Sequence, residues 1–347
     1  MKSTHFQQSG FWCDFKCAHG WKLLSEDDVN VLYRQFALGP MHSSIAYVPM
    51  APVVQNQNSD QYLSAIYEFT KRITSKLPKN TLCVRFDIPL DFSTVTERDA
   101  YVDSIPVKAR AQRIFIHKSL VDIQPPDSIF VALDKSEEEI LSAMKSKWRY
   151  NIRYAEKHNV VVRAVHAGDP SFEADLQSFY ELYKTTAKRD GIGIHPLEYY
   201  RDLLEKGRAN SDDADSTKIT LYIGSHEGED LAAIITLFNK DEAVYLYGCS
   251  GNNKRNLMPA YIVQWTAIKD AKQFGSKIYD FYGIPPTADE NHPMHGLYLF
   301  KSGFGGKEVH RPGSIDVPIS SMYSFYVCAE RFRAWYHKIF LKKIRGR

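Results

Sequence analysis

Apolar residues recur at helical spacing in two segments that lie far apart in the chain. They follow each other every three or four residues from Tyr62 to Leu77, and again from Ile262 to Phe274, where Gly275 favours the end of the helix. Short apolar runs flank both segments and indicate strands at 46–48, 82–87, 244–247 and 278–281. The pattern therefore predicts a strand, helix, strand unit that occurs twice.

This repetition, about two hundred residues apart, predicts two similar α/β domains in tandem with mixed sheets flanked by helices. Coincidence is the alternative, because strand, helix, strand units are common. Three more helices are predicted between the two units, at 136–157, 170–190 and 196–206. The domain boundary should lie near the start of the first of these, a charged helix that Ser136 can cap. The 347 residues fit two domains of ordinary size.

The composition argues against a disordered, a membrane-spanning and a disulfide-rich secreted protein. Its 44% hydrophobic and 24% charged residues are typical of folded domains, and neither an apolar run of eighteen residues nor a signal-like N-terminal segment is present. The five cysteines are scattered and odd in number, which favours a reducing compartment over a disulfide framework. His292 and His295 fall in a predicted loop, so no metal site is expected. We expect a cytoplasmic protein.

Positive charge is concentrated at the C-terminus. Residues 329–347 contain seven basic residues against Glu330, which gives +6 there and −3 for the rest of the chain. Four apolar residues recur in this segment at helical spacing, namely Phe332, Trp335, Ile339 and Phe340. They predict a basic amphipathic helix, which could lie on an anionic membrane surface or contact nucleic acid phosphates. A docked terminal helix with a solvated basic face explains the pattern equally well.

One lysine, Lys301, lies among aromatic residues and glycines in the segment 296–306. Gly303, Gly305 and Gly306 let the backbone adopt positive φ or approach a ligand closely, while the neighbouring aromatic residues favour burial. The segment is expected to be neither an ordinary helix nor an exposed loop, and a lysine held there is a candidate for chemistry. The alternative is a twisted core strand that ends in a glycine turn, with the lysine ammonium group reaching water.

Familiar catalytic signatures are absent from the sequence. It has no G-x-S-x-G elbow, no G-x-x-x-x-G-K-[ST] phosphate loop and no H-E-x-x-H metal helix. The turn at 247–259 joins a predicted strand to a helix N-terminus, where acyl-CoA N-acyltransferases bind a pyrophosphate. Those enzymes need glycines there, whereas this turn has Asn253, Arg255, Asn256 and Met258. A coenzyme A site is therefore not expected, and the chain needs another activated acyl donor.

Six strings, in order along the chain, resemble the Fem family of peptidoglycan aminoacyltransferases. They are Ser-Gly-Phe-Trp-Cys-Asp-Phe-Lys at 9–16, Arg-Phe-Asp-Ile-Pro at 85–89, Lys-Trp-Arg-Tyr-Asn-Ile-Arg-Tyr-Ala-Glu-Lys at 147–157, Leu-Tyr-Gly-Cys-Ser at 246–250, Tyr-Asp-Phe-Tyr-Gly-Ile at 279–284, and Gly-Leu-Tyr-Leu-Phe-Lys-Ser-Gly-Phe-Gly-Gly at 296–306. The resemblance implies transfer of an amino acid from an aminoacyl-tRNA to the stem-peptide amine of a cell-wall precursor.

The resemblance also implies a fold of two domains like those of acyl-CoA N-acyltransferases, that is, two GNAT-like domains. The first would comprise residues 1–135, completed by residues 317–347, and would lie on the muropeptide side. The second would comprise residues 136–316. Because the loop-like run 207–216 is short, no long helical hairpin is expected in the second domain, as in the compact members of the family.

Roles follow from the resemblance residue by residue. Lys301 matches the lysine that stabilises the oxyanion of the reacting ester, and the Phe300 carbonyl group would hold the attacking amine. Asp87 matches a base or substrate contact, although an acid paired with Arg85 explains it equally well. Precursor binding is assigned to Lys16, for the diphosphate, and to Tyr199, Tyr247, Arg85 and His195, the last in place of an arginine. A surface lysine and plain core tyrosines are the alternatives, and no general base stands out.

The resemblance implies no cofactor, with aminoacyl-tRNA as co-substrate. The acceptor would be UDP-MurNAc-pentapeptide or lipid II. We expect a monomer in the cytoplasm, with peripheral contact to the inner face of the membrane through the basic C-terminal helix. Two other functions fit some of the features: an acyl-CoA-dependent N-acyltransferase, and a non-enzymatic tRNA-binding protein whose basic tail contacts RNA.

Overall fold

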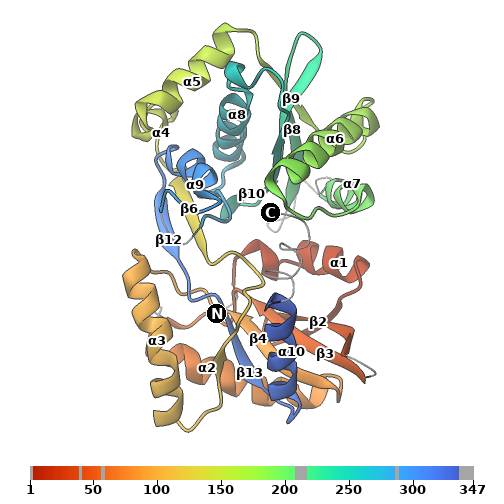
Figure 1. Cartoon of the computed structure of the whole chain (residues 1–347), viewed down its shortest axis with the longest axis vertical. Coiled ribbons are helices and arrows are strands. Elements are labelled where there is room, and N and C mark those ends of the chain that lie inside the picture. The colour runs from red at the N-terminus through yellow and green to blue at the C-terminus, as the bar shows by residue number, and fades with distance from the viewer. Residues whose placement is uncertain (1–2, 39–40, 56–58, 208–216, 286–288, 336–347) are drawn as a thin grey trace. The chain divides into compact units, whose positions relative to one another are not determined.

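The computed structural model describes residues 3–38, 41–55, 59–207, 217–285 and 289–335. The chain forms two compact units, of which unit 1 comprises Met1–Pro126 and His310–Arg347 and unit 2 comprises Asp127–Val309. Each unit is built on one mixed β-sheet flanked by helices (Figure 1). This confirms the α/β fold class that the sequence predicts.

The sheet of unit 1 has the strand order β1-β2-β3-β4-β13-β5. Its strands are β1 (Lys22–Glu26), β2 (Val29–Leu38), β3 (Met41–Pro49), β4 (Thr81–Asp87), β5 (His117–Lys118) and β13 (Ser314–Pro318). β3 and β4 are parallel, and the other neighbouring pairs are antiparallel. The helix α2 (Ser59–Ile73) joins the parallel pair, so the first predicted strand, helix, strand unit is β3-α2-β4.

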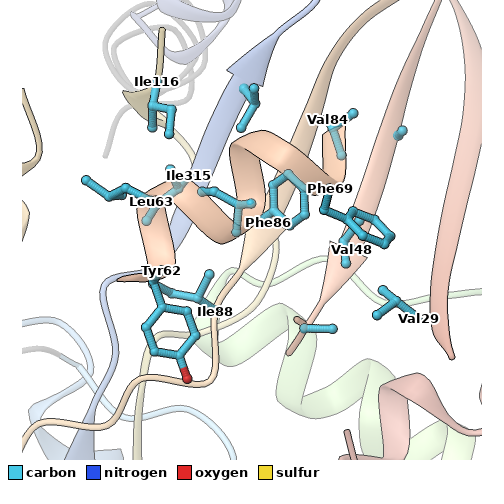
Figure 2. Close-up of a cluster of buried hydrophobic side chains, with 14 of the residues drawn as sticks. Val29, Val48, Tyr62, Leu63, Phe69, Val84, Phe86, Ile88, Ile116 and Ile315 are labelled. Carbon is cyan, nitrogen blue, oxygen red and sulfur yellow. The ribbon is translucent and has the colours of Figure 1, made fainter. Parts of the chain in front are cut away.

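Helices cover both faces of this sheet. Successive side chains of β4 point to opposite faces and pack in two separate clusters, one on each face. Val84 and Phe86 pack with Phe69 of α2, as Figure 2 shows, and α3 (Val95–Ala111) covers the same cluster. Cys83 packs instead with Tyr326 of α10 (Tyr323–Trp335). The remaining helical segments of unit 1 are η1 (Phe6–Gln8), α1 (Gly10–Ala18) and η3 (Thr74–Lys76).

The sheet of unit 2 has the strand order β12-β6-β11-β10-β9-β8-β7. Its strands are β6 (Asp127–Ala132), β7 (Val161–Val165), β8 (Lys218–His226), β9 (Glu229–Phe238), β10 (Glu242–Ser250), β11 (Ile278–Asp280) and β12 (Lys307–His310). β10 and β11 are parallel, and α8 (Pro259–Phe274) joins them. The second predicted unit is therefore β10-α8-β11, and Gly275 ends its helix with φ 95°.

The helices of unit 2 lie on both sides of its sheet, with α6 and α8 on opposite sides of β8 and β9 (Figure 1). They include α4 (Glu137–Ala143), α5 (Ser146–Lys157), α6 (Phe172–Asp190), α7 (Leu197–Lys206) and α9 (His295–Ser302), with η4 (Arg255–Leu257) before α8. The predicted helices at 170–190 and 196–206 are confirmed as α6 and α7. None of the helices in the described ranges is both long enough and apolar enough to span a membrane.

The single charged helix predicted at 136–157 is wrong, because the chain forms α4 and α5 with a break between them. Met144 is extended at the break, with ψ 150°. The backbone N–H of Lys145 donates to the carbonyl oxygen of Gly303 at 2.9 Å, and the Arg149 guanidinium group donates to the carbonyl oxygen of Met144. These partners replace the helical hydrogen bonds that a continuous helix would form.

The sequence placed the domain boundaries after residues 135 and 316. In the structure β6, which ends at residue 132, belongs to the sheet of unit 2, and β13, which begins at residue 314, belongs to the sheet of unit 1. Residues 208–216, where no helical hairpin is predicted, and residues 336–347 of the predicted amphipathic helix lie outside the described residues.

Candidate active site

The ammonium group of Lys301 is buried and bound by three consecutive backbone carbonyl groups. Its Nζ donates to the oxygens of Phe281 at 2.7 Å, Tyr282 at 2.9 Å and Gly283 at 2.7 Å. It also lies 5.1 Å from the ring centroid of Tyr245, and only 4% of the residue is exposed. Because an ammonium group has three N–H donors, the three carbonyl groups use all of them.

Burial lowers the pKa of Lys301 from 10.5 to about 7, and the charge of Asp280 acts in the opposite direction. Asp280 is fully buried and accepts hydrogen bonds from the Tyr282 N–H at 2.7 Å and from the Ser128 hydroxyl group. Tyr282 and Gly283 both have positive φ, at 47° and 88°. A tyrosine is rarely found in this conformation, so Lys301 and Asp280 together hold a strained turn at the end of β11.

The expectation that the segment 296–306 is not a helix is wrong, because most of it forms α9, which presents Lys301. The strand considered as the alternative is wrong for the same reason. The glycines that suggested an irregular segment follow the helix and have packing roles. A Cβ on Gly303 would lie 2.1 Å from Cε2 of Trp148, and Gly305 has φ 82° and passes close to the carbonyl group of Ala143.

The carbonyl oxygen of Phe300 accepts the indole N–H of Trp148 at 2.9 Å. A carbonyl oxygen has two lone pairs, so one remains for a second donor such as an amine. The Phe300 ring packs edge-on against Tyr261 with 5.3 Å between the ring centroids, and Trp148 contacts Tyr261 in the same manner at 5.6 Å. α9 is therefore fixed onto α5 by the hydrogen bond from Trp148 and onto α8 by the contact between Phe300 and Tyr261.

Three residues that the resemblance assigned to the precursor lie together in unit 2. The His195 ring stacks on Tyr199 with 3.9 Å between the centroids, and a hydrogen bond links the phenols of Tyr199 and Tyr247. Tyr200 contacts Tyr247 at 5.1 Å and accepts the backbone N–H of His195 at 3.0 Å. Burial raises the pKa of both Tyr199 and Tyr247, so these phenols keep their protons and can donate hydrogen bonds.

Strand β10 connects this tyrosine cluster to Lys301. Its pairing with β9 shifts register between Tyr245 and Tyr247, which is the signature of a bulge. Tyr245 lies against the Lys301 ammonium group, and Tyr247 belongs to the cluster. A Cβ on Gly248 would lie 1.8 Å from the Tyr245 hydroxyl oxygen. The Tyr245 side chain can therefore pack over residue 248 only because that residue is a glycine. Two nearby residues of β10, Tyr245 and Tyr247, thus contact Lys301 and the tyrosine cluster respectively.

In unit 1, Asp87 is a buried carboxyl group at the end of β4. It accepts hydrogen bonds from the hydroxyl groups of Ser314, at 2.6 Å, and of Tyr47. Burial raises its pKa from 3.8 to about 6, and the two hydroxyl donors act in the opposite direction. A carboxyl group that titrates near neutral pH is suited to proton transfer.

Lys16 lies in the last turn of α1 between two tryptophan rings. Its Nζ is 5.8 Å from the ring centroid of Trp12 and 5.7 Å from that of Trp21, and burial lowers its pKa. The Trp21 ring in turn lies 6.4 Å from that of Tyr47, which donates to Asp87. A short chain of contacts therefore joins Lys16 to Asp87 within unit 1.

Arg85 is bound to Asp316 and Glu330, so the alternative that pairs it with Asp87 is wrong. Its guanidinium group donates to the two carboxylate oxygens of Asp316 at 2.7 and 2.9 Å, and to Glu330 of α10 at 3.3 and 3.4 Å. Arg85 is 3% exposed and Asp316 1%. Tyr323 adds a hydrogen bond to Asp316 at 2.9 Å. This buried network holds β13 and α10 against β4, a geometry that favours a structural role for Arg85.

Polar side chains of the turn between β10 and α8 are hydrogen-bonded to other residues of the protein. Asn253 donates to Glu229 at 2.9 Å, and Lys254 donates to Glu227 at 3.2 Å. Met258 has φ 58° and is followed by Pro259, the first residue of α8, which has no N–H group. These features do not favour binding of a pyrophosphate at this helix N-terminus, where backbone N–H groups would be needed.

Several residues around these groups were not singled out from the sequence, namely Trp21, Tyr47, Trp148, Tyr245 and Asp280. Asp280 carried a signal, because an acidic residue in the otherwise apolar run 278–281 needs a buried partner. The others are ordinary core aromatic residues by sequence, and only their contacts distinguish them. Within the described residues, no three histidine, cysteine or carboxylate side chains gather as metal ligands would.

The fold is that of two α/β units in tandem, with a buried lysine at the end of the parallel strand pair of unit 2. The FemAB family model matches residues 1–211 and 208–331, and the chain belongs to the FemAB family. The predicted membership of the Fem family and the prediction of a transferase are thereby confirmed.

Relatives with described activities share about a fifth of their residues with this chain. Lipid II:glycine glycyltransferase of Staphylococcus haemolyticus (strain JCSC1435) is 23% identical over 252 residues, which cover 56% of this chain and 59% of that protein. The protein of the same name from Staphylococcus aureus (strain COL) is 21% identical over 333 residues, covering 79% and 76%. The crystal structure of FemX superposes with a TM-score of 0.73 at 18% identity, covering 93% of this chain and 94% of that chain, which supports the fold.

Proposed function

We propose that the chain transfers an aminoacyl group from an aminoacyl-tRNA to an amine of the stem peptide of a peptidoglycan precursor, either UDP-MurNAc-pentapeptide or lipid II. The amine attacks the ester carbonyl group, a C–N bond forms, the ester C–O bond breaks, and the terminal hydroxyl group of the tRNA leaves. The amine loses one proton in the process. The observation that carries the proposal is the FemAB match over both units, together with relatives named as lipid II:glycine glycyltransferases.

In its protonated form, which its three carbonyl acceptors favour, Lys301 supplies a fixed positive charge for the oxyanion that develops on the ester carbonyl group. Its three N–H donors are already bound to carbonyl groups, so it acts through its charge, or an ester oxygen replaces one of those carbonyl groups. A preorganised group of this kind contributes about 2.7 to 4 kcal/mol to the transition state. The carbonyl oxygen of Phe300 already accepts one hydrogen bond, from Trp148. It accepts an N–H of the attacking amine through its second lone pair.

Each unit carries groups that suit a part of the precursor. Lys16, which has Arg34 as a second nearby cation, offers positive charge to the diphosphate. The phenols of Tyr199 and Tyr247 and the stacked ring of His195 offer hydrogen bonds and a flat surface to the rest of the precursor. Asp87 serves as a contact or as a base, for which its pKa of about 6 is suitable.

We also propose that α10 brings the enzyme to an anionic membrane surface, where a lipid-linked acceptor would lie. Tyr323 and Tyr326 pack one side of α10 onto unit 1, and Glu330 ties it to Arg85. The helix nevertheless exposes large apolar side chains, namely Phe325 (54%), Phe332 (66%) and Trp335 (50%), and Met322 (38%) directly precedes it. Residues 329–347 have a net charge of +6 by sequence, and positive charge together with exposed aromatic side chains favours the interface of an anionic bilayer.

Vesicle binding tests the membrane contact. The double variant F332S/W335S should bind anionic vesicles more weakly than the wild type, while Val107→Ser, which removes an exposed apolar residue of α3, should not. Binding should also be weaker at high salt than at low salt, because the charge contribution is screened. Equal binding by all three proteins would contradict the contact without affecting the proposed chemistry.

Mass spectrometry tests the reaction itself. Each precursor is incubated with the full chain and a mixture of aminoacyl-tRNAs, and in parallel with acetyl-CoA. The proposal predicts that one precursor gains the mass of an amino acid residue in the first reaction only. An unchanged mass with every aminoacyl-tRNA, or an acetyl mass in the second reaction, would overturn it.

A further inference from the structure

Helix α5 presents an exposed row of aromatic and basic side chains that no step above uses. The row repeats at helical spacing and comprises Lys147, Tyr150, Tyr154 and Lys157, with Arg153 beside it. Tyr150 is 63% exposed, which is high for a large aromatic residue. The opposite side of α5 is buried, so the row faces solvent while the helix itself is anchored.

The aromatic rings of this row form a ladder along the helix. Tyr150 lies 5.8 Å from Tyr154, ring centroid to ring centroid, with 34° between the ring planes. Tyr154 stacks on His158 at 3.9 Å and 26°, and His158 is fixed by a 2.8 Å hydrogen bond from its Nδ1 to the carbonyl oxygen of Tyr154. Tyr154 is only partly exposed and packs against the cluster around Leu231 and Ile262. Tyr150 is thus held in place on a rigid base rather than left to move alone.

The row also carries positive charge that the protein does not neutralise. α5 has four basic residues against Glu156 alone, a net charge of +3. Lys147, Arg153 and Lys157 are exposed, and within the described parts of the chain none of them forms an ion pair. Most other surface lysines of unit 2 for which a contact is seen, such as Lys184 and Lys277, are bound to carboxylates.

Stacked rings flanked by unpaired cations are the elements with which proteins bind the bases and phosphates of nucleic acids. A lipid surface fits this row less well, because it has no aliphatic, Phe or Trp side chain exposed, in contrast to α10. α5 also carries Trp148, whose indole group holds the Phe300 carbonyl group beside Lys301. A nucleic acid bound along α5 would therefore lie on the helix that anchors the candidate active site.

We propose that the Lys147–Tyr150–Arg153–Lys157 face of α5 binds the RNA of the aminoacyl-tRNA, with Tyr150 stacking on a base and the three cations contacting phosphates. This inference rests on the proposed function, which requires such a donor. It adds a particular RNA-binding surface to that function.

The test measures binding of uncharged tRNA to the full chain by fluorescence anisotropy over a range of salt concentrations. Tyr150→Ala should raise the Kd about tenfold, whereas Tyr150→Trp, which keeps an aromatic face, should bind as tightly as the wild type. The triple variant K147A/R153A/K157A should reduce the slope of log Kd against the logarithm of the salt concentration by about 2. The matched control K184A/K240A/K277A removes three exposed lysines elsewhere in unit 2 and should leave that dependence unchanged.

The outcomes separate this inference from the proposed function. If the wild type binds tRNA and the α5 variants bind it equally well, the α5 site is overturned while the proposed function stands. If the wild type does not bind tRNA at all, both are overturned. Binding of the wild type and Tyr150→Ala to anionic vesicles is measured in parallel. If Tyr150→Ala loses vesicle binding while its tRNA binding is unchanged, this face binds lipid and the proposal is contradicted.

Discussion

The indole nitrogen of Trp148 lies 2.9 Å from the carbonyl oxygen of Phe300 and donates its N–H to it, although the two residues are 152 positions apart in the chain. The bond joins α5 to α9, the helix that carries Lys301. Gly303, which follows α9, packs against the same indole ring. The placement of the buried lysine therefore depends on a tryptophan that has no chemical role of its own.

The close contact between Gly303 and Trp148 predicts a specific loss of stability. Gly303→Ala should lower the free energy of unfolding by about 1 to 3 kcal/mol, because the new methyl group overlaps a ring that is tied to Phe300. Gly296→Ala is the matched control: it lies in α9, and a Cβ added there would meet no atom within 4 Å, so it should be neutral or slightly stabilising. Urea unfolding measures both variants, and equal effects would contradict the packing role.

The charge of Lys301 is expected to matter for transfer and not for precursor binding. Lys301→Met keeps the length of the side chain and removes the charge, so the transfer rate should fall about 100-fold or more while the Kd of the precursor stays the same. Lys307→Met removes an exposed lysine of β12 in the same unit and should leave both unchanged. Full transfer activity in Lys301→Met would remove the oxyanion role.

The raised pKa of Asp87 predicts a change of stability with pH. Its pKa is higher in the folded chain, about 6, than the ordinary 3.8, so the folded state binds more protons between these values and the stability that Asp87 contributes falls as the pH rises from 4 to 6. The advantage of the wild type over Asp87→Asn in the free energy of unfolding should therefore be larger at pH 4 than at pH 7, by up to about 3 kcal/mol. A difference that does not change with pH would show that the group is not perturbed in this way.

The buried network of Arg85 predicts that its loss acts on stability rather than on binding. Arg85→Met leaves Asp316 buried without its cation and should lower the free energy of unfolding by about 3 to 5 kcal/mol. Lys71→Ala breaks the exposed pair with Glu68 and should change it by less than about 0.5 kcal/mol. If Arg85→Met is as stable as the wild type but binds the precursor more weakly, the residue belongs to the binding site instead.

The parts of the fold that the sequence predicted are those set by local periodicity. β3-α2-β4 and β10-α8-β11 were evident because each helix has a continuous apolar face and each strand is a short apolar run. The break between α4 and α5 was not, because it is made by the carbonyl group of Gly303, far along the chain. The helix in segment 296–306 is hard to predict for a related reason: its glycines indicate irregular backbone, whereas Gly303, Gly305 and Gly306 allow close packing after the helix ends.

In the candidate site, too, some residues can be predicted from the sequence and others are evident only from the structure. Lys301 could be singled out because a lysine among buried aromatic residues is unusual in any sequence. Its three carbonyl partners could not, since they depend on a left-handed turn at Tyr282 and Gly283 that no residue pattern indicates. Likewise the partner of Arg85 is Asp316, 231 positions away, and not the neighbouring Asp87, because pairing between β4 and β13 decides which groups meet.

In the proposed reaction the donor is the amino acid esterified to tRNA. The most direct test uses a mixture of tRNAs charged with labelled amino acids, incubated with the full chain and lipid II or UDP-MurNAc-pentapeptide, and measures the label in the recovered precursor. A parallel sample is first treated with mild alkali, which hydrolyses the ester and leaves free amino acid and uncharged tRNA. We expect transfer of label from the intact sample and none from the hydrolysed one. Equal labelling from both samples, or none from either with both precursors, would contradict it.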